Sequence, residues 1–341
     1  MPDLYLYTKE DEINDVSISR PHIVILGAGA SIAAFPKGEK NGKRVPGMED
    51  LVDIVGLKPV LNKYGIEYVD GTNFEEFYSD LSSLGSNKNV LAEINQKIFD
   101  YFDSLELPDI PTIYDYLALS LRPKDFIATF NWDPFLYKAL ERNHRKVSIP
   151  KYAFLHGSVS VGYCENCKIK NGRGYKCSKC GQIYNGMPLL YPIKKKDYSS
   201  DPLIAGEWGD LAKDLSLAYM VTIFGYSAPV SDVAAVDAIK MAWGDPKKRQ
   251  FEQIELINTQ EESRVTKSWD HLLSPYYHYF YQQNFFHSFI AEHPRRTCEV
   301  LFANTMMVKF AESNPVPQNL NLEELQNWFG ELVSKESKAK N

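Results

Sequence analysis

HIVILGAGAS, residues 22–31, is the stretch that decides the fold. Its apolar run, Ile23–Leu26, is typical of a strand that is buried on both faces, as in a parallel sheet. The run leads directly into Gly27-Ala28-Gly29-Ala30-Ser31. Glycines let the backbone turn tightly and lie close to a ligand, and the N–H groups at the start of the next helix can face a phosphate. The stretch therefore predicts a nucleotide-binding strand–loop–helix, with a tight turn that binds no ligand as the alternative.

The residues after this loop narrow the class of nucleotide-binding fold. The dinucleotide fingerprint G-x-G-x-x-G requires a third glycine, where this chain has Ile32. A second strand that ends in an acidic residue about 20 positions further on is also missing. The sequence thus disfavours a hydride-transferring dehydrogenase.

Composition sets the general class of protein. The chain has 341 residues, of which 44% are hydrophobic and 13% aromatic, enough for one large α/β domain with inserted modules or for two domains. A net charge of −6 argues against a dedicated nucleic-acid surface. The sequence contains no apolar run of membrane-spanning length, and the N-terminal MPDLYLYTKEDE does not resemble a signal peptide. We therefore expect a cytoplasmic protein with neither a membrane nor nucleic acid as a direct partner.

Further apolar segments have the character of strands, and each is followed by small or polar residues. The segments are Asp125–Phe130, Tyr152–Leu155, Met220–Phe224 and Ile254–Ile257. The residues that follow them are Asn131-Trp132-Asp133, His156-Gly157-Ser158, Gly225-Tyr226-Ser227 and Asn258-Thr259. Ligands of open parallel sheets bind at the carboxyl ends of the strands, so we expect these ends to converge on one cleft.

The expected architecture is α/β: a Rossmann-like parallel sheet with helices on both faces, an inserted helical module and a small zinc-binding lobe. We place the main domain at residues 20–310, with the helical insertion at 45–115 and the zinc-binding lobe at 160–185. Within the insertion, Leu91, Ile94, Ile98 and Phe102 recur at helical spacing. Residues 311–341 are expected to form a C-terminal helix and tail.

Four cysteines form the strongest local motif. They follow the pattern Cys164-x2-Cys167-x9-Cys177-x2-Cys180. Each CxxC turn directs two thiolates to one point, and two such turns complete a tetrahedral four-sulfur zinc site. Because four protein ligands leave no open position, we expect this zinc ion to be structural.

Thr129, Asn131 and Asp133 occupy alternating positions at the end of the second strand. In an extended segment they point to one side, which brings a hydroxyl, an amide and a carboxylate to one edge of the cleft. This set suits a ribose and its hydroxyl groups. The alternative is an Asx turn in which Asp133 caps the helix that begins after Pro134.

His156 ends the third of these strands and precedes Gly157. An imidazole titrates near neutral pH and can take a proton from a hydroxyl group or from water. Its position at the carboxyl end of a strand favours a catalytic role over that of a buried structural histidine.

Taken in order, the motifs GAGAS, T-x-N-x-D, HGS, the paired CxxC turns, G-x-S and I-N resemble the sirtuin family over residues 20–260. The resemblance implies a domain that binds NAD+ and cleaves its nicotinamide–ribose bond. Asn131 and Asp133 would face the ribose on the nicotinamide side and its water, and His156 would be the general base. The pyrophosphate would be held by Gly27, Ala28, Gly29, Ala30 and Ser31. The adenosine side would be held by Gly225, Tyr226, Ser227, Asp232 and Asn258.

The sequence departs from sirtuin deacetylases where these bind the acyl-lysine. Their Gly-Ile-Pro-Asp-Phe-Arg segment is replaced by residues 32–38, IAAFPKG, and their F-G-E-x-L-P stretch is not recognisable near Leu190–Ile193. The chain looks more like the sirtuin-like NADases of bacterial anti-phage systems, which hydrolyse NAD+ to ADP-ribose and nicotinamide. The alternatives are a protein-lysine deacylase or ADP-ribosyltransferase that uses the same site, and a non-enzymatic sensor of NAD+ or ADP-ribose.

An aromatic run near the C-terminus predicts a contact with another chain. Because a constitutive NADase would be toxic, we expect a homo-oligomer or a defence-system partner protein that controls the activity. Aromatic side chains are enriched at the centres of interfaces. The competing interpretation is that the run is buried within one chain. The residues concerned are Tyr276, Tyr277, Tyr279, Phe280, Tyr281, Phe285, Phe286 and Phe289.

Overall fold

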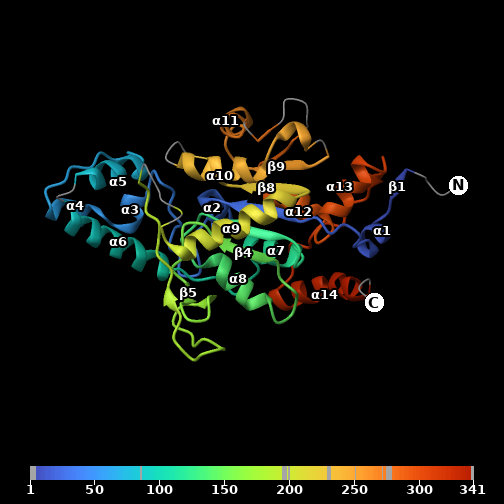
Figure 1. Ribbon diagram of the computed structural model, residues 1–341, viewed down its shortest axis with the longest axis horizontal. Helices are drawn as coiled ribbons and strands as arrows, with labels where there is room; N and C mark the ends of the chain where they lie inside the picture. Colours follow the sequence, from blue (N-terminus) through green and yellow to red (C-terminus); the bar gives the residue numbers. More distant parts are fainter. Residues whose placement is uncertain are drawn as a thin grey trace.

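A six-stranded parallel sheet forms the centre of the molecule (Figure 1). The computed structural model describes residues 5–84, 87–193, 198, 200–228, 232–249, 251–270, 272–273 and 279–338. The order of the strands is β10-β9-β8-β2-β3-β4, and every neighbouring pair is parallel. The strands are β2 (His22–Leu26), β3 (Phe126–Thr129), β4 (Lys151–Phe154), β8 (Met220–Phe224), β9 (Gln253–Ile257) and β10 (Tyr279–Gln282). The expected parallel α/β sheet is confirmed.

The connections between strands change direction at β2. From β2 the chain proceeds outward to β3 and β4 on one side, and then returns to β8, which pairs with the other side of β2. The register aligns Leu26 with Thr129 and with Phe224, so the carboxyl ends of these three strands lie at one level. Such a topological switch point leaves a crevice between the two outgoing loops, which is where ligands bind in open α/β sheets. The loops after β2 and β8 border this crevice.

Strand β10 differs from what the sequence predicts. Residues 279–282 of the aromatic run pair with β9 as the edge strand of the sheet. All four side chains are half-buried, so the run lacks the inside–outside alternation by which a strand is recognised in a sequence. Tyr276 and Tyr277 lie outside the described residues. The described part of the run packs against the chain's own sheet, where Phe285 is buried and the other described aromatic residues are half-buried. A contact with another chain stays a prediction.

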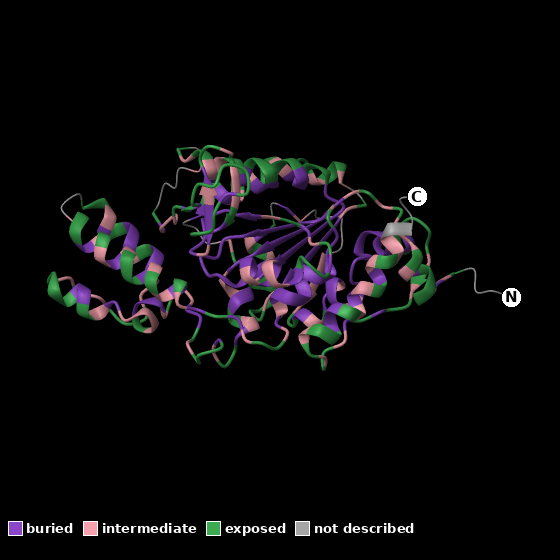
Figure 2. Cartoon of the chain, turned by 90° about the horizontal axis from the view of Figure 1, so that it is seen from below, coloured by how far each residue is buried: buried purple, intermediate pink, exposed green. Residues whose placement is uncertain are grey.

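Helices lie on both sides of the sheet, and the strands between them are buried (Figure 2). Because parallel strands are joined by crossovers, each connection places its helices over one face. These helices are α2 (Ala28–Ala34), α7 (Ile113–Ser120), α8 (Phe135–Asn143), α9 (Pro202–Leu217), α10 (Val233–Trp243), α11 (Glu262–Ser268), α12 (Phe289–Glu292) and α13 (Thr297–Thr305). Two short 3-10 turns are η2 (Pro246–Lys248) and η3 (Phe285–His287).

The helical insertion projects from one end of the molecule (Figures 1 and 2). Its helices all fall within residues 45–115. In the longest helix, Ile94, Ile98 and Phe102 are buried and Leu91 is half-buried, so the expected apolar stripe faces the core. The helices are α3 (Leu51–Val55), α4 (Lys58–Lys63), α5 (Phe74–Ser83) and α6 (Lys88–Asp103).

The two ends of the chain pack together at the other end of the molecule. β1 (Leu6–Tyr7) pairs in parallel with β11 (Phe310–Ala311), and α1 (Lys9–Asn14) contacts α14 (Leu322–Lys338). The stripe Leu325, Phe329 and Leu332 is buried in the main core, so this C-terminal helix is part of the domain's packing. Within the described ranges, no helix combines the length and the apolar character needed to cross a membrane.

A third, antiparallel sheet forms a small lobe beside α8. Its strands have the order β6-β5-β7. They are β5 (Val161–Cys164), β6 (Ile169–Gly172) and β7 (Asn185–Gly186). The lobe therefore occupies the part of the chain that the cysteine pattern predicts.

Candidate functional site

Residues 27–31, here called the glycine loop, form the junction of β2 and α2 and are closed tightly against the end of β8. The N–H groups of Gly27 and Gly29 donate to the carbonyls of Phe224 (3.0 Å) and Gly225 (2.9 Å). A Cβ on Gly29 would lie 2.7 Å from the Cα of Gly225, which itself has a φ of +64°. Only glycine permits such a close approach of two backbones. These two N–H groups are thus used within the protein, whereas the sequence led us to expect that N–H groups of this loop face a phosphate.

Four side chains from distant parts of the chain meet behind this loop. The Ser31 hydroxyl donates to Asp133 Oδ2 at 2.6 Å and lies 2.5 Å from the phenol oxygen of Tyr114. The Asn131 amide nitrogen donates to Ser31 Oγ and to the carbonyl of Gly27, both at 2.9 Å. With both amide hydrogens used inside the protein, Oδ1 is the atom that Asn131 can offer to a ligand or to water. The structure therefore brings together Ser31, Asn131 and Asp133, which the sequence assigns to one ligand site.

Asp133 supports this cluster from within the core. Its Oδ2 accepts from Ser31, and its Oδ1 accepts from the backbone N–H of Phe135 at 3.2 Å. The second contact is the Asx turn that the sequence offered as the alternative, and both oxygens of this buried carboxylate thus have partners within the protein. Burial raises the pKa of the Asp133 carboxyl to about 6, and the two hydrogen bonds oppose that rise. Thr129 has a local role, because its Oγ1 accepts from Asn131 N at 3.0 Å.

His156 lies at the carboxyl end of β4 among aromatic rings. Its Nε2 lies 3.1 Å from the Tyr198 hydroxyl, and the two rings are stacked with an interplanar angle of 9°. Phe130, the residue before Asn131, meets the imidazole edge-on with ring centroids 4.8 Å apart. Phe130 therefore links His156 to the cluster of Ser31, Asn131 and Asp133. His156 itself is buried.

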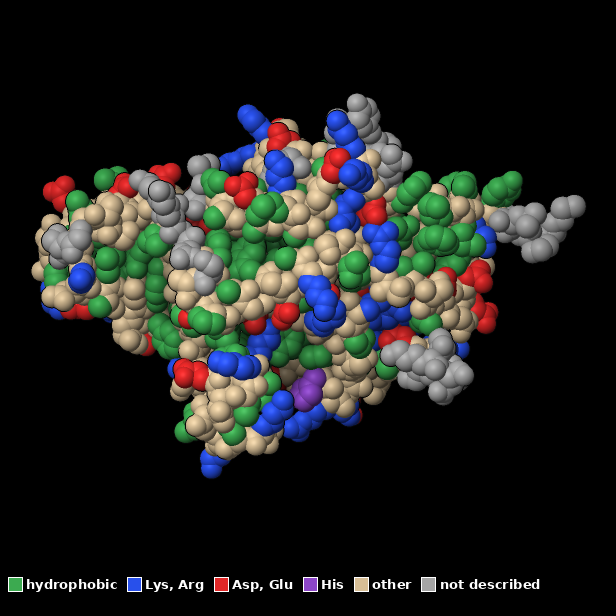
Figure 3. Space-filling model, in the orientation of Figure 1, with side chains coloured by type: hydrophobic (Ala, Val, Ile, Leu, Met, Phe, Trp, Pro, Cys, Tyr) green, Lys and Arg blue, Asp and Glu red, His purple; other side chains and the backbone are tan. Residues whose placement is uncertain are grey.

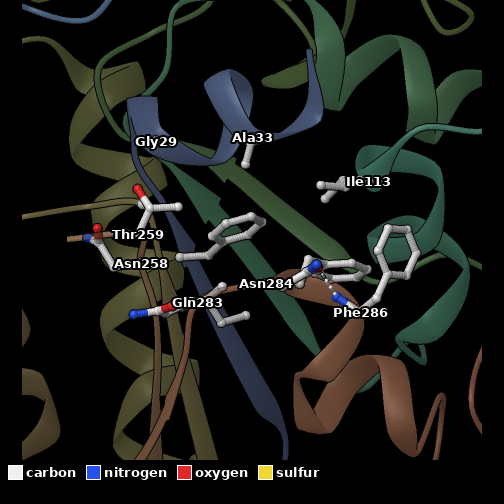
Figure 4. A pocket seen from close by; sticks show the side chains of 12 residues that line it. Gly29, Ala33, Ile113, Asn258, Thr259, Gln283, Asn284 and Phe286 are labelled. Atoms are coloured by element: carbon white, nitrogen blue, oxygen red, sulfur yellow. Dashed lines mark hydrogen bonds between the residues drawn. The ribbon is translucent and has the colours of Figure 1, made fainter. Parts of the chain in front are cut away.

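A pocket of about 340 Å³ opens on the other side of the glycine loop (Figure 4). Its polar side chains come from the end of β9 and from the segment after β10, including Asn258 and Asn284. Gly29 and Ala33 of α2 form a further wall (Figure 4). The full lining is Gly29, Ala33, Ile113, Phe224, Gly225, Ile257, Asn258, Thr259, Gln283, Asn284, Phe285 and Phe286. Such a mixture of apolar walls and a few amides suits a flat heteroaromatic ring joined to a sugar that carries hydroxyl groups.

The residues predicted for the adenosine side are divided between this pocket and the core. Gly225 and Asn258 line the pocket. The Tyr226 ring instead stacks on Phe130 with centroids 4.0 Å apart, and its hydroxyl donates to Asp232 at 3.0 Å. Ser227 is exposed. Tyr226 and Asp232 are both buried, and neither lines the pocket.

The four cysteines meet in the small lobe. The sulfur atoms of Cys164, Cys167, Cys177 and Cys180 all lie within 4.8 Å of one another. In a tetrahedral zinc site with bonds of 2.3 Å, sulfur atoms are about 3.8 Å apart, so the cluster has the dimensions of such a site. Cys167 N also donates to Cys164 Sγ at 3.4 Å, an arrangement that favours the thiolate form of the ligand. The donor set fits one closed, structural zinc ion.

The lobe is attached to the strand that carries His156. Lys170 of β6 lies 2.7 and 2.8 Å from the two oxygens of Glu207 on α9. Glu207 Oε2 also accepts from the backbone N–H of Phe154 on β4 at 2.7 Å. Because β4 is the edge of the sheet, this carboxylate satisfies a strand N–H that would otherwise lack a partner. One side chain thereby holds together the lobe, α9 and the end of β4.

Several residues of the site escaped sequence-based prediction. Tyr114 is reached through α7, whose capping box of Thr112 and Asp115 follows the T-x-x-D pattern that marks a helix start. That pattern was available in the sequence and would have placed Tyr114 in the first turn. Phe285 and Phe286 lie in the aromatic run, where nothing local distinguishes a pocket wall from other buried aromatics. Tyr198 is brought to His156 by tertiary packing alone.

Comparisons with known proteins found similarity only among solved structures. Neither the protein-family models nor the curated proteins gave a match to this sequence. A Sir2 homologue in complex with NAD is 14% identical, with a TM-score of 0.40, covering 86% of this chain and 91% of that one. A structure described under the mechanism and regulation of Sir2 enzymes is 16% identical, with a TM-score of 0.38, covering 86% and 95%. These values are too low to assign a family, so the function is argued from the residues of the site.

Proposed function

We propose that the protein is an NAD+ glycohydrolase that converts NAD+ and water to ADP-ribose, nicotinamide and a proton. The observation that carries this proposal is the anchoring of Asn131. Its amide nitrogen is held by Gly27 and Ser31, so Oδ1 is presented beside a glycine loop at the topological switch point of the sheet. The motifs that resemble sirtuins fall on these same positions.

NAD+ would bind across the end of β2. The pocket lined by Phe224, Phe285 and Phe286 offers apolar faces to the adenine, and Asn258 offers an amide to the adenosine ribose. The pyrophosphate would cross the loop at Gly29, where no side chain blocks the backbone. This path directs the nicotinamide ribose toward Asn131 and His156.

The chemistry at the ribose follows from these two residues. As the bond to nicotinamide breaks, positive charge develops at ribose C1′, and the bonding electrons leave with the nicotinamide nitrogen. Asn131 Oδ1 accepts a hydrogen bond from the water that attacks C1′, and His156 takes the proton that this water releases. Asp133 and Tyr114 act as positioning residues, because they fix the Ser31 hydroxyl to which the Asn131 amide is bonded.

Hydrolysis is favoured over deacylation by the segment that replaces the peptide-binding stretch. Tyr191 packs against Trp132, with ring centroids 5.5 Å apart, and against Tyr78 of the helical insertion at 5.7 Å. Its hydroxyl also donates to the carbonyl of Asn95 at 3.1 Å. A side chain bonded in this way fills space that a peptide substrate would require. We further propose that the enzyme depletes NAD+ in a bacterial anti-phage defence system, and that a second copy or a partner protein controls it.

The test is incubation of the purified protein with NAD+, with and without an acetylated peptide, while free nicotinamide is measured by chromatography. We expect release of nicotinamide and ADP-ribose without peptide. Release that requires the peptide would indicate a deacylase, and binding of NAD+ without turnover would indicate a sensor. Because a partner is expected to control the activity, the cellular NAD+ level after expression is measured in parallel.

A further inference from the structure

Positive charge is concentrated in one part of this acidic protein. Residues 138–187, from α8 to the end of the small lobe, contain ten Lys and Arg and two Asp and Glu. The whole chain has 38 Lys and Arg and 44 Asp and Glu. The chain-wide net charge of −6 therefore conceals a strongly basic segment, and a local excess of this kind is the electrostatic footprint of a polyanion-binding surface.

Half of these ten cations already have partners inside the protein. Arg142 pairs with Asp115, Lys151 with Asp214, Lys170 with Glu207 and Arg173 with Asp103, and Lys138 donates to the carbonyl of Leu105. The other five are exposed, and the described part of the chain contains no ion pair that involves them. They are Arg145, Lys146, Lys168, Lys176 and Lys179.

The five free cations lie on two elements that are joined to each other. Arg145 and Lys146 follow the end of α8, whereas the three lysines lie beside or inside the CxxC turns of the lobe. The Tyr137 hydroxyl of α8 donates to Asn171 of the lobe at 2.8 Å. A hydrogen bond to Glu141, also on α8, raises the pKa of Tyr175 in the lobe. Figure 3 shows Lys and Arg side chains gathered over α8 and the β5 lobe, along the lower edge of the molecule.

We propose that this basic surface, formed by Arg145, Lys146, Lys168, Lys176 and Lys179, binds a single strand of nucleic acid. Cations that are not neutralised within the protein can contact successive phosphates and release the counterions of the strand. The surface also carries an aromatic ring on which a base can stack, since Tyr175 is 51% exposed. An acidic peptide would use the cations alone, so this ring favours nucleic acid.

The lobe is suited to present these cations in fixed positions. Lys179 lies between the second pair of cysteines, Lys176 directly precedes that pair, and Lys168 directly follows the first pair. A four-thiolate zinc site fixes the backbone of both turns, so little conformational freedom of the main chain is lost on binding. None of the five cations lines the NAD+ pocket or touches the Asn131 cluster. The inference therefore stands independently of the proposed hydrolase activity.

The experiment is fluorescence anisotropy of a labelled single-stranded DNA of roughly 20 nucleotides, titrated with the zinc-loaded full chain at several salt concentrations. Five phosphate contacts predict that log K falls with log salt with a slope of about −3.5. The double variant Lys176→Gln/Lys179→Gln removes two contacts and should make that slope shallower by about 1.4. At low salt we expect its affinity to fall at least about tenfold.

The matched control is Lys240→Gln/Lys248→Gln, which changes the net charge equally but on α10 and η2. Figure 1 shows α10 on the opposite side of the molecule from the β5 lobe. It should bind DNA like the wild type, and both variants should keep the wild-type melting temperature. No anisotropy change at tens of micromolar protein in about 50 mM salt would overturn the proposal. An equal loss of affinity in the control variant would also overturn the proposal. So would displacement of the labelled DNA by polyglutamate as effectively as by unlabelled DNA, because that result would indicate an acidic polypeptide as the partner.

Discussion

Asp133 accepts a hydrogen bond from Ser31 at 2.6 Å, although the two residues are 102 positions apart in the chain. This bond joins α2 to the segment between β3 and α8. The Tyr114 hydroxyl lies on the other side of Ser31 Oγ, at 2.5 Å, and so fixes the same oxygen. Since Ser31 donates to Asp133, Tyr114 is the donor to Ser31, and the Asn131 amide completes the set. The orientation of Asn131 therefore depends on Tyr114.

Tyr114→Phe should lower the turnover number for NAD+ without unfolding the protein. Phenylalanine keeps the buried ring but removes the donor to Ser31, which costs roughly 1 kcal/mol, or about fivefold in rate. The effect should fall on kcat rather than KM, because Tyr114 acts on Asn131 through Ser31. Tyr116→Phe, on the same helix, serves as the control, because the Tyr116 hydroxyl donates to the carbonyl of Pro317, away from Ser31 and Asn131. A fall in melting temperature at unchanged kcat would show that Tyr114 is merely structural.

Asn131→Ala and His156→Ala should each nearly abolish NAD+ cleavage while the fold is retained. Loss of a positioned acid–base group lowers a rate by about 100- to 10,000-fold. Nicotinamide release gives the rate, and circular dichroism checks the fold. Near-wild-type turnover of His156→Ala would assign His156 to the aromatic packing around Tyr198 and would remove it from the mechanism.

The sequence predicts the sheet and the cluster better than it predicts the pocket. Strand β2 and the glycine loop are recognised from a local pattern of apolar and small residues. Asn131 and Asp133 are recognised because they come just after an apolar strand. Neither prediction needs tertiary information. The pocket depends on Asn284 and Phe286, which reach it only because β10 pairs with β9. Edge strands with half-buried side chains carry no alternating pattern. Tyr198 and Tyr114 approach the site through packing of separate elements, which no local pattern records.

The basic surface, like the pocket, could not be predicted from the sequence alone. Net charge is a property of the whole chain, whereas binding depends on which cations are exposed and lack carboxylate partners. Lys170 and Lys176 are six residues apart, yet Lys170 is neutralised by Glu207 and Lys176 is exposed. Only the fold distinguishes the two.

The purified, reduced protein should contain about one zinc ion per chain, by the four-thiolate argument. Cys177→Ser should lower the zinc content and the soluble yield, because metal binding is coupled to folding of the lobe. Cys298→Ala is the matched control, since Cys298 is buried in a separate cluster with Tyr219 and Leu301. Metal analysis that finds no zinc in the wild type, or equal loss in both variants, would contradict the assignment.

Glu255 should make the protein less stable as the pH rises toward neutrality. Burial raises the pKa of its carboxyl from 4.5 to about 7, opposed by hydrogen bonds from Phe289 N and the Thr222 hydroxyl. Between these two pH values the folded protein keeps a proton that the unfolded chain has released. The free energy of unfolding therefore falls by roughly 3 kcal/mol as the pH rises from about 4.5 to 7.

Glu255→Gln tests this origin of the pH dependence. Glutamine resembles the protonated acid, because its oxygen can accept from Phe289 N and its amide can donate to the Thr222 hydroxyl. That hydroxyl can then donate to His22 Nε2, which lies 2.8 Å from Thr222 Oγ1. Urea unfolding at several pH values should show a flatter profile for the variant. A smaller slope should persist, since burial also raises the pKa of Asp133 to about 6. A profile identical to that of the wild type would show that Glu255 does not titrate in this range.

Gly157→Ala should destabilise the protein far more than Gly174→Ala, although both glycines have nearly the same backbone conformation. Their φ angles are +80° and +82°, a left-handed region that costs alanine about 1 kcal/mol in either place. At Gly157 the added Cβ would also lie 1.9 Å from the carbonyl oxygen of Pro188, whereas at Gly174 it would meet no atom within 4 Å. The Pro188 segment cannot move away freely, because Leu190 N donates to the carbonyl of His156. We therefore expect Gly157→Ala to lower the free energy of unfolding by roughly 3 kcal/mol, compared with about 1 kcal/mol for Gly174→Ala. Urea midpoints measured side by side decide the matter, and equal midpoints would mean that the Pro188 segment is not fixed against the end of β4.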